Sequence, residues 1–196
     1  MTDYFALLHQ PRQPWLHLEK LKQVFHEETL RAHPDARVPG VDGIEAEGAF
    51  AQINEAYQVL RDPRRRLHHL LSLEGQAPAA AGGPIPQEIA DVFQTVAAST
   101  QAADRVVQKA AAAINPLSRA LLRGELVQAC SLLNEALDTL LRLRTEADVD
   151  LQQLNNSFAE TVEDRFVGLS SLFLRYSYLT RWISQLEEKK THLSAC

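Results

Sequence analysis

Apolar residues recur at the spacing of an α-helix along most of this chain. Leu18, Leu21 and Phe25 fall on one face of a first amphipathic segment. They predict a helix that starts near Leu16 and ends by His33, because the residue before a proline is pushed out of the α region. A second apolar stripe predicts a partner helix and consists of Ala46, Ala49, Phe50, Ile53, Ala56, Tyr57 and Leu60.

Short helices are predicted on either side of this pair. Asp3 can accept hydrogen bonds from the first turn of a helix through Tyr4–Leu8. Pro63 suits the first turn of another helix, with Asp62 as its N-cap. Gly75 suits the C-terminal end of that helix. The pattern therefore predicts an antiparallel helical hairpin with flanking short helices.

Residues 76–86 contain few side chains that could build a core and several that break helices, so they predict a linker. Three helical patterns follow it, from Gln87 to about Ala113, from Leu117 to Arg144 and from Leu151 to Leu186. The polar stretch Thr145–Asp148 separates the last two, and an antiparallel three-helix bundle is expected. The sequence predicts an all-α protein with one domain over 1–75 and another over 87–196.

Composition narrows the possible functions. The formal net charge is −5, which argues against a broad nucleic-acid-binding surface. No apolar run approaches the length of a membrane span, and the first residues lack the pattern of a signal peptide. Cys130 and Cys196 lie far apart and predict neither a disulfide framework nor a zinc site. We expect a cytoplasmic monomer with no nucleic-acid partner, no membrane partner and no cofactor.

Enzymatic chemistry is not expected from this sequence. No nucleophile–base pair and no phosphate-binding glycine loop is visible. His26, His68 and His69 lack carboxylate or cysteine companions at ligand spacing, so we expect them to be solvated or to lie at the edge of a core.

Candidate chemistry concentrates in the tripeptide His33-Pro34-Asp35, which lies between the two predicted hairpin helices. Pro34 fixes the backbone φ angle, and Asp35 offers a carboxylate that an arginine can bind through two hydrogen bonds. His33 can both donate and accept. Such side chains suit recognition by another protein. The alternative is an ordinary helix stop, in which Pro34 breaks the helix and Asp35 forms a turn.

A helix, a His-Pro-Asp loop and an antiparallel partner helix resemble the J-domain of DnaJ-type co-chaperones. The resemblance implies that the loop contacts an ATPase chaperone of the DnaK type, with Asp35 meeting an arginine of that chaperone. It also implies that the J-domain shifts the chaperone between conformations and donates no catalytic group to it.

Further chaperone-binding residues are predicted from the same resemblance. J-domains usually show a basic face on the second helix, and Lys20 and Arg31 share a face here. Glu27 lies between them, so a solvated mixed-charge surface is the alternative. Arg66 resembles the arginine that many J-domains carry after an Asp-Pro pair. The predicted chaperone-binding residues are His33, Pro34, Asp35, Lys20, Arg31 and Arg66.

Three segments narrow the resemblance to HscB, the J-protein family of iron–sulfur cluster assembly: Asp3–Leu8, Leu67–Gly75 and Arg175–Lys189. A J-domain followed by a three-helix domain is also the layout of that family. The resemblance implies two partners for this chain. It would stimulate the ATPase of a DnaK/HscA-type chaperone, and its C-terminal domain would deliver an IscU-like iron–sulfur cluster scaffold protein to that chaperone.

One departure from the family concerns the client. HscB proteins carry a Met- and Glu-rich run early in the C-terminal domain, whereas Ile89–Thr100 holds no Met and almost no charge. We predict Val92 and Phe93 as client-binding residues, with core packing as the alternative for both. Two other functions stay open. One is a J-domain co-chaperone for a different client, and the other is a helical protein-interaction module with a non-functional J-like segment.

Overall fold

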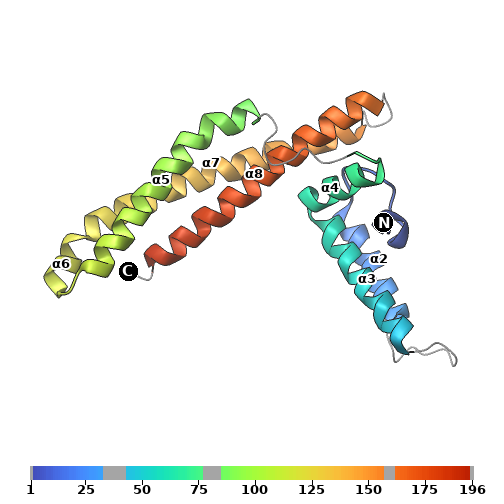
Figure 1. Ribbon diagram of the computed structural model, residues 1–196, viewed down its shortest axis with the longest axis horizontal. Helices are drawn as coiled ribbons and strands as arrows, with labels where there is room; N and C mark the ends of the chain where they lie inside the picture. The colour runs from blue at the N-terminus through green and yellow to red at the C-terminus, as the bar shows by residue number, and fades with distance from the viewer. Residues whose placement is uncertain (1, 33–42, 77–84, 157–161, 195–196) are drawn as a thin grey trace. The chain divides into compact units, whose positions relative to one another are not determined.

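The chain is helical throughout the part that its structure describes. The computed structural model describes residues 2–32, 43–76, 85–156 and 162–194, and these ranges form helices and no strand. The helices are α1 Tyr4–Leu7, α2 Leu18–Arg31, α3 Gly43–Arg61, α4 Pro63–Leu73, α5 Gln87–Ala112, α6 Pro116–Leu121, α7 Arg123–Asn156 and α8 Val162–Ser194. The predicted all-α class, a helical hairpin with flanking short helices followed by a three-helix bundle, is confirmed (Figure 1).

Residue contacts divide the chain into two compact units. Unit 1 contains Met1–Ala80 together with Asp150–Phe173, and unit 2 contains Ala81–Val149 together with Leu174–Cys196. The long helices α7 and α8 therefore contribute residues to both units. The predicted linker over 76–86 stays a prediction.

The core of unit 1 lies among the helices of the hairpin and the short helices beside it. The α2 and α3 helices lie side by side and run in opposite directions (Figure 1), and the rings of Phe25 and Tyr57 stack between them with centroids 4.1 Å apart. Ring stacking and burial of apolar area both stabilise this pairing. The buried core residues of this part of unit 1 include Phe5, Leu8, Leu21, Ile53, Ala56, Leu60, Leu67, Leu70 and Leu71.

Local capping fixes the ends of the short helices as the sequence predicts. The Asp3 carboxylate accepts hydrogen bonds from the backbone N–H groups of Phe5 and Ala6, at 3.0 and 3.2 Å. Asp62 caps α4 by accepting from the Arg65 N–H at 2.8 Å. Gly75 follows α4 with a φ of 71°, a left-handed conformation that glycine adopts without steric cost.

The helices α7 and α8 of the bundle begin and end at other residues than the sequence predicts. Thr145–Asp148 does not interrupt a helix, because α7 continues through it to Asn156. Leu143, Ala147 and Leu151 are buried at four-residue spacing, while the polar side chains between them lie at or near the surface. A polar stretch on the outer face of an amphipathic helix does not break it.

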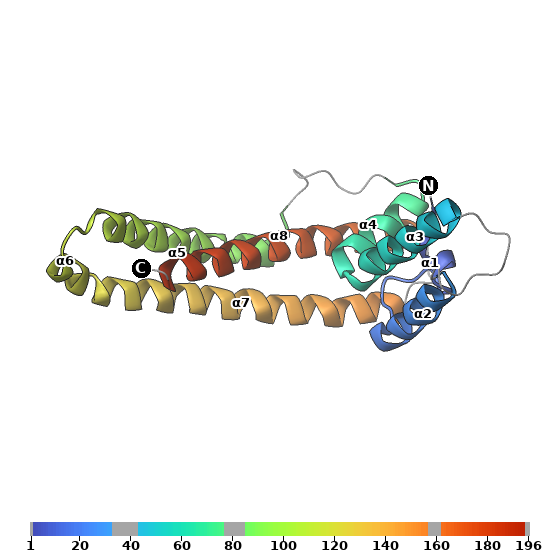
Figure 2. The same ribbon diagram turned by 90° about the horizontal axis from the view of Figure 1, so that it is seen from below.

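A second difference concerns the start of that helix. The sequence predicts one helix from Leu117, whereas the structure has the short α6 and then α7 from Arg123. Asn115 caps α6 by accepting from the Ser118 N–H at 2.8 Å. The three long helices α5, α7 and α8 then build the bundle (Figure 2).

Candidate functional site

The His33-Pro34-Asp35 tripeptide lies outside the described residues. The helices on either side of it are described: α2 ends at Arg31 and α3 begins at Gly43. In the sequence, the tripeptide therefore stands at the junction of the two hairpin helices.

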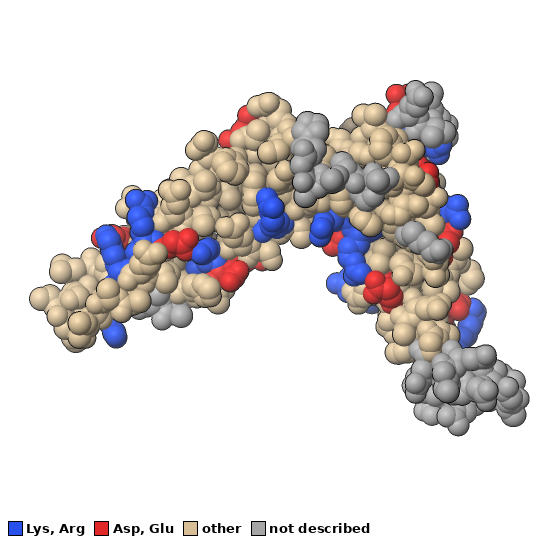
Figure 3. Space-filling model, viewed as in Figure 1, with Lys and Arg blue, Asp and Glu red and all other residues tan. Residues whose placement is uncertain are grey.

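The exposed cations of α2 lie among acidic groups. Lys20 is exposed, and Arg31 is exposed and forms an ion pair with Glu28 one turn earlier. The same carboxylate lies 3.4 Å from Nε2 of His9. On the face shown in Figure 3, basic and acidic side chains of unit 1 are interspersed. Lys20 is the stronger remaining candidate for an exposed contact, because the charge of Arg31 is partly neutralised by Glu28.

Arg66 is buried, although it was predicted to contact a chaperone. Only 2% of the residue is exposed. Its Nε donates to the carbonyl of Pro14 at 2.7 Å, and one terminal nitrogen donates to the carbonyl of Leu60 at 2.5 Å. A guanidinium group presents several donors in a fixed plane, so one side chain can hold both carbonyls. This geometry corrects the predicted role: Arg66 positions the segment before α2 and the end of α3, and does not reach out to a partner.

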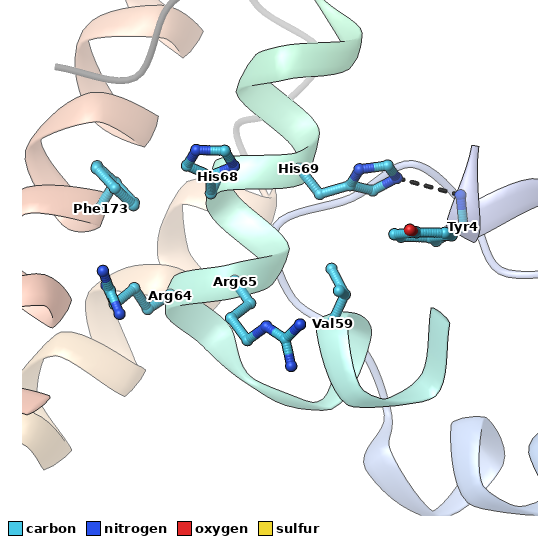
Figure 4. Close-up of a pocket in the computed structure, with 7 residues that line it drawn as sticks. All are labelled: Tyr4, Val59, Arg64, Arg65, His68, His69 and Phe173. Atoms are coloured by element: carbon cyan, nitrogen blue, oxygen red, sulfur yellow. Dashed lines mark hydrogen bonds between the residues drawn. The ribbon is translucent and has the colours of Figure 1, made fainter. Parts of the chain in front are cut away.

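His69 is a second buried polar side chain of α4, and sequence reasoning missed its role. It is 3% exposed, and its Nε2 accepts a hydrogen bond from the Tyr4 N–H at 3.1 Å (Figure 4). The imidazole also stacks on the rings of Tyr4 and Phe5, with centroids 4.6 and 5.7 Å away. Because Nε2 is an acceptor, it carries no proton. Burial lowers the pKa of His69 from its ordinary 6.5, although the Asp3 carboxylate opposes the shift.

A hollow of about 390 Å³ opens beside His69 in unit 1. Its lining residues come from α1, α3, α4 and α8, and are Tyr4, Val59, Arg64, Arg65, His68, His69 and Phe173 (Figure 4). The Arg65 guanidinium bonds to Glu55 at 2.8 Å. The rings of His68 and Phe173 lie 5.7 Å apart at the edge of the hollow. The described residues hold no group of three or more His, Cys, Asp and Glu side chains that could bind a metal ion.

An aromatic surface in unit 2 contains one of the two predicted client-binding residues. Phe93 is 52% exposed, and its ring lies 6.0 Å from that of Trp182. The Trp182 ring in turn lies 5.6 Å from that of Tyr178. Val92 is only partly exposed. We refer to Phe93, Tyr178 and Trp182 as the aromatic surface. The Phe93 ring is exposed, and the less exposed rings of Trp182 and Tyr178 pack next to it.

The aromatic surface lies beside a stretch of α5 that carries no charge. No charged residue occurs from Val92 to Ala103 on α5. One cation lies beside it: the Arg181 guanidinium is 5.4 Å from the centre of the Tyr178 ring. Contacts at this surface would therefore be mainly apolar.

Among the described helices, none is long and apolar enough to cross a membrane.

Comparison with known sequences finds similarity concentrated in the first part of the chain. Residues 3–69 match the DnaJ domain family. A co-chaperone HscB homologue from Vibrio cholerae is 43% identical over 75 residues, which are 37% of this chain and 44% of that protein. Human DnaJ homolog subfamily B member 3 is 33% identical over 104 residues, which are 53% of this chain and 68% of that protein.

A DnaJ chaperone from Gluconacetobacter diazotrophicus is 32% identical over 96 residues, which are 47% of this chain and 24% of that protein. The chain thus spans less than half the length of this DnaJ protein and of the HscB homologue.

Comparison with solved structures finds similarity over nearly the whole chain. The structure of chaperone HscB from Vibrio cholerae matches with a TM-score of 0.54 at 20% identity, covering 98% of this chain and 99% of that one. The crystal structure of the human co-chaperone protein HscB matches with a TM-score of 0.62 at 17% identity, covering 97% and 83%. At this level of identity the likeness concerns the fold, which these proteins share from the hairpin to the last helix.

Proposed function

We propose that this chain, which belongs to the DnaJ family, is a J-domain co-chaperone of the HscB type and stimulates the ATPase of a DnaK/HscA-type chaperone. We propose further that it delivers an IscU-like iron–sulfur cluster scaffold protein to that chaperone. The observation that carries the proposal is a DnaJ-domain sequence, with His33-Pro34-Asp35 inside it, in a chain that has the HscB fold.

Stimulation requires only that the J-domain bind one conformation of the chaperone better than another. Asp35 would pair with an arginine of the chaperone, and the fixed φ of Pro34 would limit the conformations that the carboxylate must give up on binding. His33 would add a hydrogen bond from the same loop. Lys20, exposed on α2, would supply electrostatic attraction to an acidic patch of the chaperone.

Client binding would use the aromatic surface of unit 2. Phe93 projects from a face of α5 that lacks charge, so the scaffold would be held mainly by apolar contact. Val92, half-buried on the same helix, would contribute less. Binding of this kind should vary little with salt, since screening acts on exposed charges.

A second candidate function has a specific observation in its favour. The uncharged segment from Val92 to Ala103 differs from the Met- and Glu-rich run of HscB proteins, which favours a J-domain co-chaperone with a different client. Both candidates use the same chaperone contact, so the test must separate the chaperone step from the client step.

A single-turnover ATPase assay makes this separation. The full chain is added to the DnaK/HscA-type chaperone of the same organism, with and without the iron–sulfur scaffold. We expect Asp35→Asn to abolish stimulation under both conditions, while Asp138→Asn, an exposed control on α7, changes neither. Phe93→Ser should remove only the increment that the scaffold adds, and Leu141→Ser, 50% exposed on α7, should keep it.

The outcomes distinguish the alternatives. Full stimulation by Asp35→Asn would reject the J-domain mechanism. Stimulation that depends on Asp35 but never responds to the scaffold would point to a different client.

A further inference from the structure

Unit 2 exposes aliphatic side chains at one end of its bundle. We call residues 105–124 the α6 tip, which comprises the end of α5, all of α6 and the first residues of α7. Within it Ile114 is 95% exposed, Leu117 71% and Leu121 75%. Leu117 and Leu121 are four residues apart on α6, so they lie on one face. Aliphatic side chains this exposed and this close together mark a contact site for something apolar.

The charge of the α6 tip differs from that of the chain as a whole. The protein carries a formal net charge of −5, yet residues 105–124 contain no Asp or Glu. They contain four cations, which are Arg105, Lys109, Arg119 and Arg123, and all four are exposed. Lys109 bonds to Glu125, just beyond the tip, at 2.6 Å. The α6 tip shows mainly uncharged surface, and both basic and acidic side chains lie on the bundle next to it (Figure 3).

The shape of the α6 tip decides which kind of partner fits. The α6 helix stands at the end of the bundle in both ribbon views (Figures 1 and 2). Side chains exposed by 71–95% project into solvent and do not line a groove. A stable protein interface uses about 20–30 residues from each side, which a projecting turn does not supply. A lipid surface needs only apolar side chains that reach past the headgroups and cations that meet the lipid phosphates.

We propose that the α6 tip binds an anionic lipid surface. Ile114, Leu117 and Leu121 enter the boundary between headgroups and acyl chains, while the basic side chains contact lipid phosphates. Our sequence-based expectation of no membrane partner rested on the lack of a membrane span, and a protein that lies on a membrane needs none. The proposal does not depend on the chaperone function.

Vesicle binding by the full chain tests the proposal. The chain is sedimented with vesicles of equal phosphatidylglycerol and phosphatidylcholine, and with vesicles of phosphatidylcholine alone. We expect binding to the anionic vesicles only, and weaker binding at 0.5 M salt, where the Debye length falls to roughly 4 Å.

Matched variants locate the site. Leu117→Ser with Leu121→Ser should lower the bound fraction by roughly ten-fold or more, because both aliphatic side chains are lost from the interface. Arg105→Gln with Arg123→Gln should lower it to a similar extent. Leu141→Ser, half-exposed on α7 outside the tip, should bind like the parent chain. Circular dichroism melts of each variant exclude unfolding as the cause.

Two outcomes would overturn the proposal: no sedimentation with anionic vesicles, or binding that the tip variants leave unchanged. If vesicle binding is absent and the tip variants also abolish the scaffold-dependent ATPase increment, the α6 tip is a protein contact instead.

Discussion

The two units satisfy their buried polar groups in different ways. Every α-helix leaves four N–H and four C=O groups without partners inside the helix, whatever its length. The helices α1 to α4 of unit 1 have 4 to 19 residues and are shorter than α5, α7 and α8, so helix ends make up a larger share of their backbone. Its buried polar side chains serve these ends: His69 accepts from the first N–H of α1, and Arg66 donates to a carbonyl in the last turn of α3.

Unit 2 is built mainly from long helices that satisfy most of their own backbone groups. Its buried polar side chains bond to groups along the helices and not to the backbone at their ends, and the Ser99 hydroxyl donates to the Val96 carbonyl within α5 at 3.0 Å. Tyr176, which is completely buried, donates its hydroxyl to Asp148 at 2.6 Å. Arg175, also buried, donates to the Leu143 carbonyl at 3.4 Å and lies 3.5 Å from Glu88 and 3.7 Å from Glu146.

The comparison suggests why the sequence matches concentrate where they do. A bundle of long helices requires apolar residues at regular spacing, and many sequences meet that requirement. A hairpin held at its helix ends by particular side chains tolerates fewer substitutions. The DnaJ-domain match over 3–69 includes both Arg66 and His69, whereas the bundle resembles HscB structures in fold at 17–20% identity.

The largest expected effect tests the backbone contacts of unit 1. Arg66→Met should lower the free energy of unfolding of unit 1 by about 2–4 kcal/mol, because two buried carbonyls lose a charged donor. Urea unfolding followed by fluorine NMR of 5-fluorotryptophan measures this, since Trp15 lies in unit 1 and Trp182 in unit 2.

Arg65→Met is the matched control, one residue away. It removes an exposed ion pair with Glu55, which should contribute at most about 1 kcal/mol. If Arg66→Met and Arg65→Met cost the same, or if the Trp182 signal shifts as much as that of Trp15, the proposed contrast between the units is wrong.

A smaller effect is expected from the side-chain contacts of unit 2. Tyr176→Phe should lower the free energy of unfolding by about 1 kcal/mol, because it removes one hydrogen bond and keeps the buried ring beneath the Arg144 guanidinium. Tyr178→Phe, on the same helix but partly exposed, should change it by less than about 0.5 kcal/mol. The Trp182 signal reports both variants. A cost of several kcal/mol for Tyr176→Phe would mean that unit 2 also depends on specific polar contacts.

The smallest effect concerns pH. Burial lowers the pKa of His69 below 6.5, so below pH 6.5 the unfolded chain binds a proton that the folded chain resists. The contribution of His69 to stability is therefore complete above pH 6.5 and is lost as the pH falls through the folded pKa. Urea midpoints of the Trp15 signal between pH 7.5 and 5 should show this decline more strongly than those of Trp182.

Two variants identify the group responsible. His69→Phe should flatten the Trp15 profile in this window, and His68→Gln should leave it sloped. Asp3 acts at lower pH: burial alone would raise the pKa of Asp3, but Arg12 and the N–H groups of Ala6 and Phe5 outweigh it and hold it below 3.8. A slope that survives His69→Phe would assign the pH response to another group.

Sequence reasoning succeeded where a feature depends on neighbours along the chain. The caps at Asp3 and Asp62, the left-handed Gly75 and the C-terminal end of α2 follow from local hydrogen bonding and steric limits. It failed at Thr145–Asp148, where a polar run was taken for a break. A polar run ends a helix only if its apolar neighbours also lose their spacing, and Leu143, Ala147 and Leu151 keep theirs.

The sequence by itself determined the helical class, the capped ends of the short helices and the His33-Pro34-Asp35 tripeptide that suggests a J-domain. All of these are set by spacing or by residues within a few positions of one another. The tertiary structure alone decided that Arg66 faces inward, that His69 holds the first residue of α1 and that Ile114, Leu117 and Leu121 are left outside the core. Arg66 bonds to Pro14, 52 positions away in the chain, and His69 bonds to Tyr4, 65 positions away. No local rule brings such distant groups together.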